Sequence, residues 1–355
     1  MKILITGATG YIGGAAAEAL LARGHHVIAL VRSPRSANTV RGRGLEPVRG
    51  DFSDPASLHT AITDSRPDAV VSTASLGASQ GDNAATFARD RDAVLAMQQA
   101  LAGSGAALIF TSGSAVFGTF NAGHAAQAVY AEDSRAPLPR ATLAPPGTRV
   151  PAVIVAGFAE AMAARVETEQ TVLTDAQVRG IVVRPGLVYG LGGNSDIAFL
   201  IARARARGRA GHWGPGETTQ SFVHVEDLAE LYCLAVEHAP PGAVLHATTD
   251  DVTQRELGRV VSRMLGAGDH TDSLTLADML DMNTTTRLGL SLAGRLPPPL
   301  RRSIASHFTP PASFGSAISM SVNKRLSSDK TRELTGWRPS RLDILHDIEH
   351  GSYAA

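Results

Sequence analysis

Residues 6–14 read Thr-Gly-Ala-Thr-Gly-Tyr-Ile-Gly-Gly, and they stand between a short apolar run and a run of strong helix formers. The order is therefore a strand, a glycine turn and a helix, which is the context of a dinucleotide-binding loop. Gly7 permits a sharp turn, Gly10 lets the backbone approach a pyrophosphate, and Gly13 lets the helix lie close to the strand. The helix N-terminus offers unpaired N–H groups to phosphate oxygens. This pattern predicts a nucleotide-binding unit, against the alternative of an ordinary glycine-rich turn.

The composition of the 355-residue chain is that of a globular protein, with 44% hydrophobic residues and a formal net charge of zero. A pI near 7.2 gives no sign of a nucleic-acid or membrane surface. The single cysteine, Cys233, excludes an intramolecular disulfide framework and lies in an apolar run typical of a core. The scattered histidines predict no metal site. We expect a cytoplasmic protein without a signal peptide or transmembrane segment, whose partner is a small-molecule substrate.

Short β-rich runs alternate with helical runs in the first half of the chain. We expect strands at residues 3–5, 27–31, 68–72, 107–111 and 181–184, and helices that include 83–102 and 153–174. This alternation predicts an α/β fold with a parallel sheet, which binds ligands at the carboxyl ends of its strands. We predict a Rossmann-type doubly wound domain over residues 1–190. Residues 191–355 are expected to form mainly a smaller substrate-binding lobe, with some segments returning to the Rossmann core.

An inserted loop of unusual composition is expected at about residues 120–151, where five prolines gather. A connection of this length is often a lid or a functional insertion, or else it is disordered. The composition favours neither alternative.

The predicted second strand ends in basic rather than acidic residues. Arg32, Ser33 and Arg35 stand where an acidic residue would bind the ribose hydroxyls of NAD, whereas a basic residue accommodates the extra phosphate of NADP. The planar guanidinium group also makes bidentate hydrogen bonds to phosphate. The sequence therefore favours NADP(H). NAD(H) is the alternative, in which Arg32 stacks over the adenine and does not discriminate.

Two further strand ends are expected to lie along the cofactor. Asp51 could accept a hydrogen bond from the adenine amino group, with Phe52 packed beside the ring. Asp54 is instead expected to cap the helix that follows, because proline occupies the first position of that helix. Residues 72–75 have small side chains, which would let the backbone lie against the cofactor.

Six motifs resemble the extended short-chain dehydrogenase/reductase family of NAD(P)-dependent epimerases and dehydratases. They are Thr6-Gly-Ala-Thr-Gly-Tyr-Ile-Gly13, Gly50-Asp-Phe52, Thr111-Ser-Gly-Ser-Ala-Val-Phe-Gly118, Arg184-Pro-Gly-Leu-Val-Tyr-Gly190, Phe222-Val-His-Val-Glu-Asp-Leu-Ala229 and Leu334-Thr-Gly-Trp-Arg-Pro339. They span nearly the whole chain and are more specific for the fold than for the reaction. Together with the glycine loop, the resemblance implies cofactor contacts at Gly7, Thr9, Gly10, Tyr11, Ile12, Gly13, Arg32, Ser33, Arg35, Asp51, Phe52, Thr73, Ala74, Ser75, Ser112, Arg165, Pro185, Gly186, Leu187 and Val188.

The resemblance also implies catalysis by a Ser or Thr, a Tyr that exchanges the alcohol proton, and a Lys that lowers the pKa of the Tyr. The family's hydroxyl position falls on Gly113, between two serines. Its Tyr-x-x-x-Lys motif best matches Ala161 to Arg165, and no other Tyr-x-x-x-Lys occurs in the sequence. Arg165 could hold a ribose hydroxyl or pair with Glu169 on the same helix face, but an arginine does not titrate as a lysine does.

The ordinary proton donor is therefore missing, and several other residues are candidates to replace it. The candidate catalytic residues are Ser114, Ser112, Tyr189, Tyr130 and Arg165, and His124 and His212 lie in loops that could reach the same cleft. Among these, Ser114 is the strongest candidate for a hydroxyl contact to the substrate. His224 lies between two valines and is expected to be structural.

Three functions fit these observations. The leading hypothesis is an NADP(H)-dependent oxidoreductase that acts on a small carbonyl or alcohol substrate. The missing tyrosine motivates the second, a non-redox isomerase, cyclase or dehydratase that retains the cofactor. The third is an NADP(H)-sensing regulatory protein, because a fold does not determine a function. A homodimer through the long central helices would fit the family.

Overall fold

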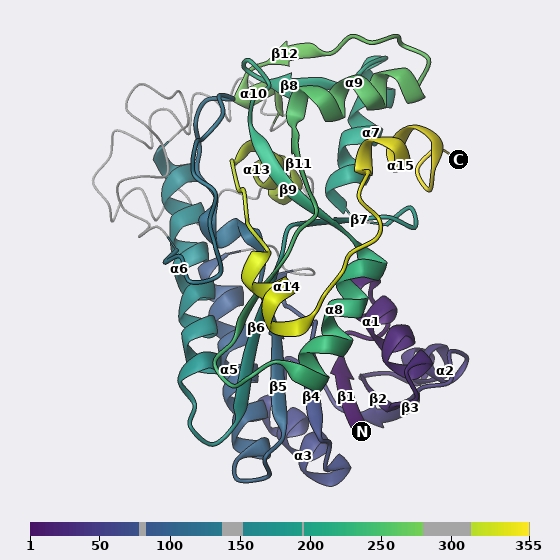
Figure 1. Ribbon diagram of the computed structural model, residues 1–355, viewed down its shortest axis with the longest axis vertical. Helices are drawn as coiled ribbons and strands as arrows, with labels where there is room; N and C mark the ends of the chain where they lie inside the picture. The colour runs from purple at the N-terminus through teal and green to yellow at the C-terminus, as the bar shows by residue number, and fades with distance from the viewer. Residues whose placement is uncertain (78–82, 137–151, 194, 280–313, 355) are drawn as a thin grey trace.

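The computed structural model describes residues 1–77, 83–136, 152–193, 195–279 and 314–354, and Figure 1 shows their arrangement. A seven-stranded sheet runs through the lower half of the molecule in the order β10-β6-β5-β4-β1-β2-β3, and every pairing within it is parallel. Its strands are β1 (Lys2–Thr6), β2 (His26–Val31), β3 (Glu46–Arg49), β4 (Ala69–Ser72), β5 (Ala107–Thr111), β6 (Arg179–Pro185) and β10 (Val244–Ala247). The predicted α/β fold with a doubly wound parallel sheet is confirmed.

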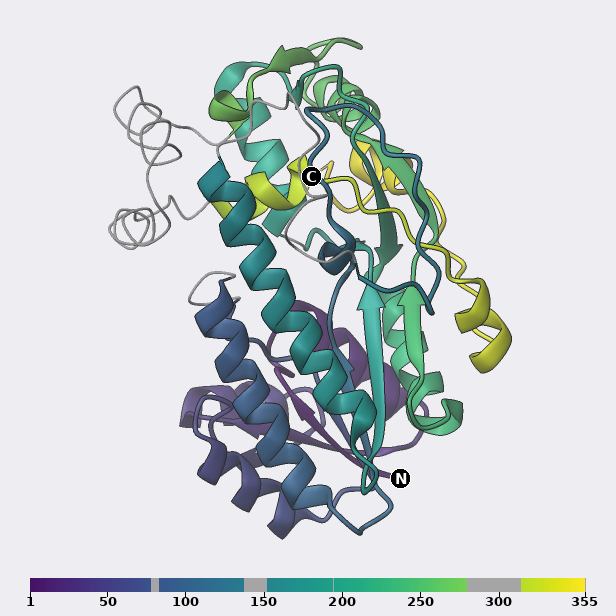
Figure 2. The same ribbon diagram turned by 90° about the vertical axis from the view of Figure 1, so that its left-hand side faces the viewer.

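Helices cover both faces of this sheet (Figures 1 and 2). One face carries α3 (Pro55–Ser65), α5 (Ala84–Leu101) and α6 (Ala152–Thr174), and the other carries α1 (Tyr11–Ala22), α8 (Val225–His238) and, beside β2 and β3, α2 (Pro34–Arg41). Alternating residues of β1 enter the two cores: Ile3 and Ile5 pack beneath α1 and α8, while Leu4 packs beneath α3 and α5. Apolar side chains on both faces of each strand explain why the sequence shows continuous apolar runs.

A smaller set of elements lies beyond the carboxyl ends of the sheet strands (Figure 1). It contains a sheet of β7 (Leu187–Tyr189), β9 (Thr219–His224) and β11 (Asp250–Thr253), and a pair of β8 (Gly211–Trp213) and β12 (Asp272–Leu274). Its helices are α7 (Ser195–Arg207), α9 (Gln254–Met264), α10 (Leu276–Met279), α13 (Phe314–Ser321) and α15 (Ile344–His350), and α14 (Asp329–Thr335) packs beside β10. Both α8, which packs on the large sheet, and β10, which is one of its strands, follow residue 190, so the chain crosses between the two parts more than once.

The described part of the expected proline-rich loop is fastened by Asn323. The Asn323 side chain accepts hydrogen bonds from the N–H groups of Ala126, at 3.2 Å, and Thr219, at 2.9 Å, and donates one to the carbonyl of His124, at 2.9 Å. Asn323 also forms an antiparallel bridge with Thr119. Residues 119–126 are therefore held beside β9 through Asn323. Residues 137–151 lie outside the described residues, so the choice between a lid or functional insertion and a disordered connection stays open there.

Two local predictions are confirmed by the geometry. Asp54 caps α3, because its carboxylate accepts hydrogen bonds from the N–H groups of Ala56 and Ser57. His224 caps α8, because its Nδ1 accepts a hydrogen bond of 3.3 Å from the N–H of Glu226. Within the described residues, no helix is long and apolar enough to cross a membrane.

A buried ion pair fixes α6 against the sheet. Arg184 on β6 donates to both carboxylate oxygens of Glu169 on α6, at 3.0 and 2.6 Å, and neither side chain is more than 5% exposed. Arg184 also stacks over the ring of Phe117, with 5.1 Å to the centroid. Glu169 is therefore not the partner of Arg165 that the sequence suggested as one alternative.

We expect the change Glu169→Gln to lower the free energy of unfolding by about 3–5 kcal/mol, because it leaves the Arg184 charge buried without its counter-charge. Urea unfolding followed by circular dichroism would measure the loss. Glu167→Gln is the matched control: Glu167 lies on the same helix, pairs with Arg91 at 2.7 Å and is 62% exposed, so this change should cost less than about 1 kcal/mol. Equal losses in the two variants would contradict the assignment.

Candidate active site

The dinucleotide loop, residues 7–13, is shaped by two glycines that admit no side chain. Gly7 has a φ of +79°, and a Cβ at this position would lie 2.8 Å from the Thr73 hydroxyl. A Cβ at Gly13 would lie 2.3 Å from the carbonyl oxygen of Gly7. Gly10 begins α1 as its N-cap, no side chain caps this helix end, and its first turn contains no acidic residue. The backbone N–H groups at this N-terminus therefore have no side-chain cap, and they can donate hydrogen bonds to a phosphate group.

The loop is joined to the end of β4, at the point where the strand order of the sheet reverses. The Thr73 hydroxyl donates to the carbonyl of Thr6 at 2.7 Å, and the N–H of Ala74 donates to the Thr6 hydroxyl at 3.2 Å. Ser75 is turned away from this gap, because its hydroxyl donates to the buried carboxylate of Asp90 on α5 at 2.6 Å. Ligands of doubly wound sheets bind at such reversal points.

Tyr11 connects the dinucleotide loop to the segment that follows β7. Its hydroxyl donates to the carbonyl of Gly190 at 2.7 Å, and burial raises the pKa of this hydroxyl. A Cβ at Gly193 would lie 2.1 Å from the Tyr11 ring, so the two segments are in close contact. Tyr353, near the C-terminus, donates to the carbonyl of Gly193 at 2.6 Å. Ile12 packs against the core beneath α1. The side chain of Tyr11 thus ties the loop to the segment that follows β7.

The residues expected near the adenosine end lie at the ends of β2 and β3. Arg32 and Arg35 are exposed, while Ser33 caps α2 by accepting a hydrogen bond of 3.2 Å from the N–H of Ser36. The Asp51 carboxylate is bound to Ser53, whose N–H and hydroxyl donate to it at 2.8 and 2.7 Å. These bonds, and to a smaller extent the charge of Arg32, lower the pKa of Asp51. Phe52 is partly buried against the core beneath α3.

Arg43 is a cation at this end that the sequence analysis missed. Its guanidinium donates to the carbonyl of Ala8, inside the dinucleotide loop, at 3.3 Å. It lies so close to α1 that a Cβ at Gly14 would be 2.7 Å from its Nη1 atom. Because Arg43 follows α2 and not the strand end, no motif marks it. The only signal is its place in the run Arg41-Gly-Arg-Gly44.

The hydroxyl site, residues 112–114, follows β5 and leads into a short 3-10 helix, Ser114–Phe117. Ser112 and Ser114 are both buried, and Gly113 between them has open space where a Cβ would stand. Arg165 on α6 donates to the Ser112 hydroxyl at 3.2 Å and to the carbonyl of Thr111 at 3.0 Å. Its guanidinium also lies 4.8 Å from the ring centroid of Phe87. The structure therefore brings together Ser112 and Arg165, two of the candidate residues.

A hydroxyl pair beneath this site was not foreseen. The Tyr232 hydroxyl, fully buried on α8, lies 2.7 Å from the Thr111 hydroxyl. Burial raises the pKa of Tyr232, so this hydroxyl stays protonated at neutral pH. Because Tyr232 and Thr111 are 121 residues apart in the sequence, no local pattern could indicate their contact.

Of the five tyrosines, Tyr130 is the one whose hydroxyl has no hydrogen-bond partner among the described residues. The other four hydroxyls, at Tyr11, Tyr189, Tyr232 and Tyr353, bind Gly190, Arg341, Thr111 and Gly193. Tyr130 stacks on Phe117, with 4.4 Å between ring centroids, and shares an apolar cluster with Ala161. Burial raises its pKa. Tyr189, in contrast, is buried edge-on against His224 and directs its hydroxyl away to the carbonyl of Arg341.

The histidine candidates are not brought to the hydroxyl site by any contact that we observe in the described residues. His124 is exposed and lies 3.5 Å from the carboxylate of Glu217. His212 is buried beside Thr271, and burial lowers its pKa. No group of three or more potential metal ligands occurs in the described part of the chain.

The β6–β7 turn brings residues 185–188 to the same edge of the sheet. The N–H of Gly186 donates to the carbonyl of Ala247 at 2.9 Å, and a Cβ at Gly186 would lie 2.4 Å from the carbonyl oxygen of Ser221. Pro185 ends β6, while Leu187 and Val188 begin β7. This turn, the hydroxyl site and the dinucleotide loop therefore all follow strands of one parallel sheet and gather at its carboxyl edge.

A family model described as the NAD dependent epimerase/dehydratase family matches residues 3–246. The chain belongs to this family. Its relatives include an uncharacterised protein of Saccharomyces cerevisiae, 25% identical over 98% of each chain. Another is 2-alkyl-3-oxoalkanoate reductase of Stenotrophomonas maltophilia, 27% identical over 88% of this chain and 90% of the relative. The fold is similar to that of UDP-glucose 4-epimerase of Thermotoga maritima, with a TM-score of 0.66, 18% identity and coverage of 100% and 97% of the two chains.

Membership of the NAD dependent epimerase/dehydratase family makes this chain a nicotinamide-dependent enzyme of the oxidoreductase or epimerase type. The open N-terminus of α1 and the side-chain-free glycine loop fit the diphosphate of such a cofactor. Ala161 and Arg165, which the sequence matched to the Tyr-x-x-x-Lys motif, lie one turn apart on α6. Ala161 is buried, and Arg165 contacts Ser112.

We expect Gly13→Ala to weaken the binding of nicotinamide dinucleotides by at least about 10-fold, because the new methyl group displaces the Gly7 carbonyl and with it the helix N-terminus. Fluorescence titration with NADPH and NADH would measure both affinities. Gly157→Ala is the control, because a Cβ at Gly157 on α6 meets no atom within 4 Å; its affinity should equal that of the parent. Unchanged binding in Gly13→Ala, with the fold intact by circular dichroism, would contradict the placement of the diphosphate.

Proposed function

We propose that this protein is an NADP(H)-dependent reductase that interconverts a ketone and an alcohol on a small organic substrate. The observation that carries the proposal is the pairing of Arg165 with Ser112, which holds one buried hydroxyl and a fixed positive charge at the carboxyl edge of β5. A carbonyl oxygen becomes negatively charged during reduction, and hydroxyl donors next to a cation stabilise that charge. The open space at Gly113 leaves room for such an oxygen between Ser112 and Ser114.

The names of the relatives support a ketone as the substrate. They include 2-alkyl-3-oxoalkanoate reductase of Stenotrophomonas maltophilia, a quinoline-oxide ketoreductase of Stigmatella aurantiaca and dTDP-4-dehydro-6-deoxy-D-allose reductase of Streptomyces bikiniensis. Each name describes the reduction of a carbonyl group. The identities of 27% and 28% support this reaction class but not a shared substrate.

Three arginines support the preference for NADP(H). Arg32 and Arg35 are exposed at the end of β2, and Arg43 reaches the dinucleotide loop from the far end of α2. No acidic residue stands at the end of β2, where an acid would repel a 2′-phosphate. Guanidinium groups suit a phosphate because they bind it in a bidentate manner.

In the proposed reaction, the nicotinamide supplies the hydride to the carbonyl carbon when the cofactor is bound. The hydroxyls of Ser112 and Ser114 orient the carbonyl oxygen by donating hydrogen bonds. Arg165 keeps the Ser112 hydroxyl in place and stabilises the developing negative charge, while its charge does not change with pH. The alkoxide must then gain one proton to become the alcohol. We assign this proton to Tyr130, whose hydroxyl is the one that the described structure leaves unpaired.

A non-redox isomerase or dehydratase is the second candidate, and buried Ala161 is the observation that favours it, because a tyrosine is absent from the family's position for it. Incubation with NADPH and a panel of ketones separates the two functions. Stoichiometric oxidation of NADPH supports the reductase. Product formed without any net change in NADPH would instead establish the second candidate.

We expect the double change Arg32→Glu and Arg35→Glu to lower kcat/KM for NADPH by about 10²-fold or more, and to leave kcat/KM for NADH within about 3-fold, because only NADPH carries the repelled phosphate. Steady-state kinetics with both cofactors would measure the change. Arg41→Glu is the control: Arg41 lies on α2 and its guanidinium is bound to Asn38, away from the loop. A parallel loss with both cofactors would refute the assigned selectivity.

We expect Ser112→Ala to lower kcat by about 10–10³-fold with a small change in KM, because one donor to the developing oxyanion is lost.

Tyr130→Phe should lower kcat by about 10²-fold or more if Tyr130 supplies the proton. Ser104→Ala, far from the site at the amino edge of the sheet, should change neither constant. Full activity in Tyr130→Phe would exclude Tyr130 as the proton donor and leave Ser112 and Ser114 as the remaining candidates for that role.

A further inference from the structure

The turn that follows β7 has an unusual backbone conformation. Gly190, Leu191 and Gly192 have φ values of +103°, +53° and +67° in succession. Leucine rarely adopts a positive φ, and Leu191 is 63% exposed, so the packing of its own side chain does not explain this conformation. Such a backbone persists only where the surrounding contacts fix it. We name residues 190–193 the 190–193 turn.

Two tyrosine hydroxyls from distant parts of the sequence fix the 190–193 turn. Tyr11 donates to the carbonyl of Gly190 at 2.7 Å. Tyr353 accepts a hydrogen bond of 2.9 Å from the N–H of Gly190 and donates one of 2.6 Å to the carbonyl of Gly193. The Tyr353 hydroxyl therefore bridges the two ends of the turn. Burial raises the pKa of Tyr353 to about 12, so this hydroxyl keeps its proton at neutral pH.

The 190–193 turn also packs closely against the segments that carry these tyrosines. A Cβ at Gly193 would lie 2.1 Å from the Tyr11 ring, and a Cβ at Gly192 would lie 3.2 Å from the carbonyl oxygen of Ser352. The turn is therefore in direct contact both with the start of α1 and with the C-terminal segment, so a displacement of either one would displace the turn.

The segment that carries Tyr353 is anchored to the smaller set of elements. Figure 1 shows α15 beside β7, and Ile344 of α15 and Tyr353 share an apolar cluster with Tyr189 of β7. The Asp347 carboxylate accepts hydrogen bonds of 2.9 Å from both the N–H and the hydroxyl of Ser352. These contacts fix the backbone on both sides of the short link between α15 and Tyr353.

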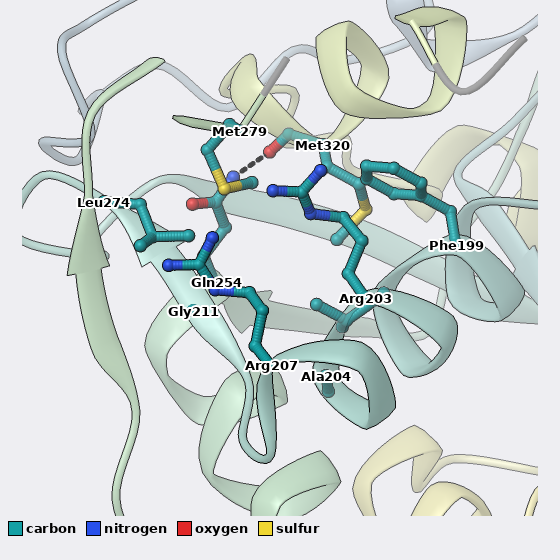
Figure 3. Close-up of a pocket in the computed structure, with 10 residues that line it drawn as sticks. Phe199, Arg203, Ala204, Arg207, Gly211, Gln254, Leu274, Met279 and Met320 are labelled. Carbon is teal, nitrogen blue, oxygen red and sulfur yellow. Dashed lines mark hydrogen bonds between the residues drawn. The ribbon is translucent and has the colours of Figure 1, made fainter. Parts of the chain in front are cut away.

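The elements on which α15 rests are close-packed. The pocket between α7, α9 and α13 that Figure 3 shows has a volume of about 20 Å³, which is room for a single water molecule. Gln254 at this pocket donates to the carbonyl of Met320, and Leu200 and Met320 belong to the same apolar cluster as Tyr353. Because close-packed interiors have low compressibility, they give the C-terminal segment a fixed support.

Tyr11 links this support to the dinucleotide loop. It is the first residue of α1, so its backbone N–H is one of those that the helix N-terminus offers to a diphosphate, while its hydroxyl is held by Gly190. The backbone and the side chain of one residue therefore face two different partners. A change in the 190–193 turn would act on the start of the helix through the Tyr11 ring.

We propose that Tyr353 is a positioning residue for cofactor binding: by fixing the 190–193 turn against Tyr11, it sets the direction of the N–H groups at the start of α1 that receive the diphosphate. This role rests on the placement of the diphosphate at α1, which the proposed function shares. It does not depend on the reduction of a ketone, and it can be measured with the cofactor alone.

The test is a double-mutant cycle on the full-length chain, in which fluorescence titrations measure the affinities for NADPH and NADH. Tyr353→Phe and Tyr11→Phe each keep the ring and remove only the hydroxyl, and each should weaken both cofactors by at least about 5-fold. The double variant should bind at most about 2-fold more weakly than the weaker single variant, because both hydroxyls act on one turn.

Ser262→Ala is the matched control for the loss of a buried hydroxyl. Ser262 lies on α9 in the same set of elements, and its hydroxyl accepts a hydrogen bond of 3.1 Å from the N–H of Ala210, next to β8. This change should lower the temperature of thermal unfolding and leave both affinities within about 2-fold of the parent. A purely structural role for Tyr353 would give the same result in Tyr353→Phe.

Unchanged affinities in Tyr353→Phe, losses that multiply in the double variant, or an equal loss of affinity in Ser262→Ala would each overturn the proposed role. A loss confined to NADPH would also overturn it, because the diphosphate is common to both cofactors. Tyr353-dependent binding of both cofactors in a protein that oxidises no NADPH with any ketone would support this role and refute the reductase alone.

Discussion

The absence of two side chains, at Gly7 and Gly13, is the constraint on which the cofactor half depends. A Cβ at Gly13 would lie 2.3 Å from the Gly7 carbonyl, so only glycine lets α1 begin directly against the end of β1. That contact aims the N-terminal N–H groups of α1 over the gap between β1 and β4. Thr6 and Thr73 then close the gap from beneath through their hydrogen bonds. The nicotinamide can reach Ser112 and Ser114 only if the cofactor lies along the carboxyl edge of the parallel sheet.

The opposite end of the site is organised by a different kind of contact, a chain of charged and aromatic groups. Glu169 holds Arg184, Arg184 stacks over Phe117, and Phe117 stacks on Tyr130. Arg165, one turn before Glu169, is thereby kept at the end of β5, where it binds Ser112. The buried ion pair therefore acts on the site indirectly, by fixing the position of α6. Such pairs are costly to desolvate, and their value here is the geometry that they impose.

The local parts of this structure could be predicted from the sequence, and the non-local parts could not. The glycine loop, the alternating strands and the Asp54 cap follow from short patterns with a direct physical meaning. The motif match of Ala161 and Arg165 indicated Arg165 as a site residue but not its contact with Ser112. Arg43, in contrast, acts through a contact across 35 residues, and Tyr232 through one across 121. Neither contact produces a recognisable pattern in the residues that neighbour it in the sequence. The choice of Arg184 over Arg165 as the partner of Glu169 likewise depends on the register of β6, which the sequence does not reveal.

The role of Asn323 has a consequence for the order of events during synthesis. It secures residues 119–126 through contacts that span nearly 200 positions, at separations of 197 and 199 residues. The strands and helices that cradle the dinucleotide can pair as they leave the ribosome, since their connections are short. The segment that Asn323 secures can only be fastened after all but the last few dozen residues have emerged. A nascent chain can therefore form its dinucleotide-binding unit before this segment is in place.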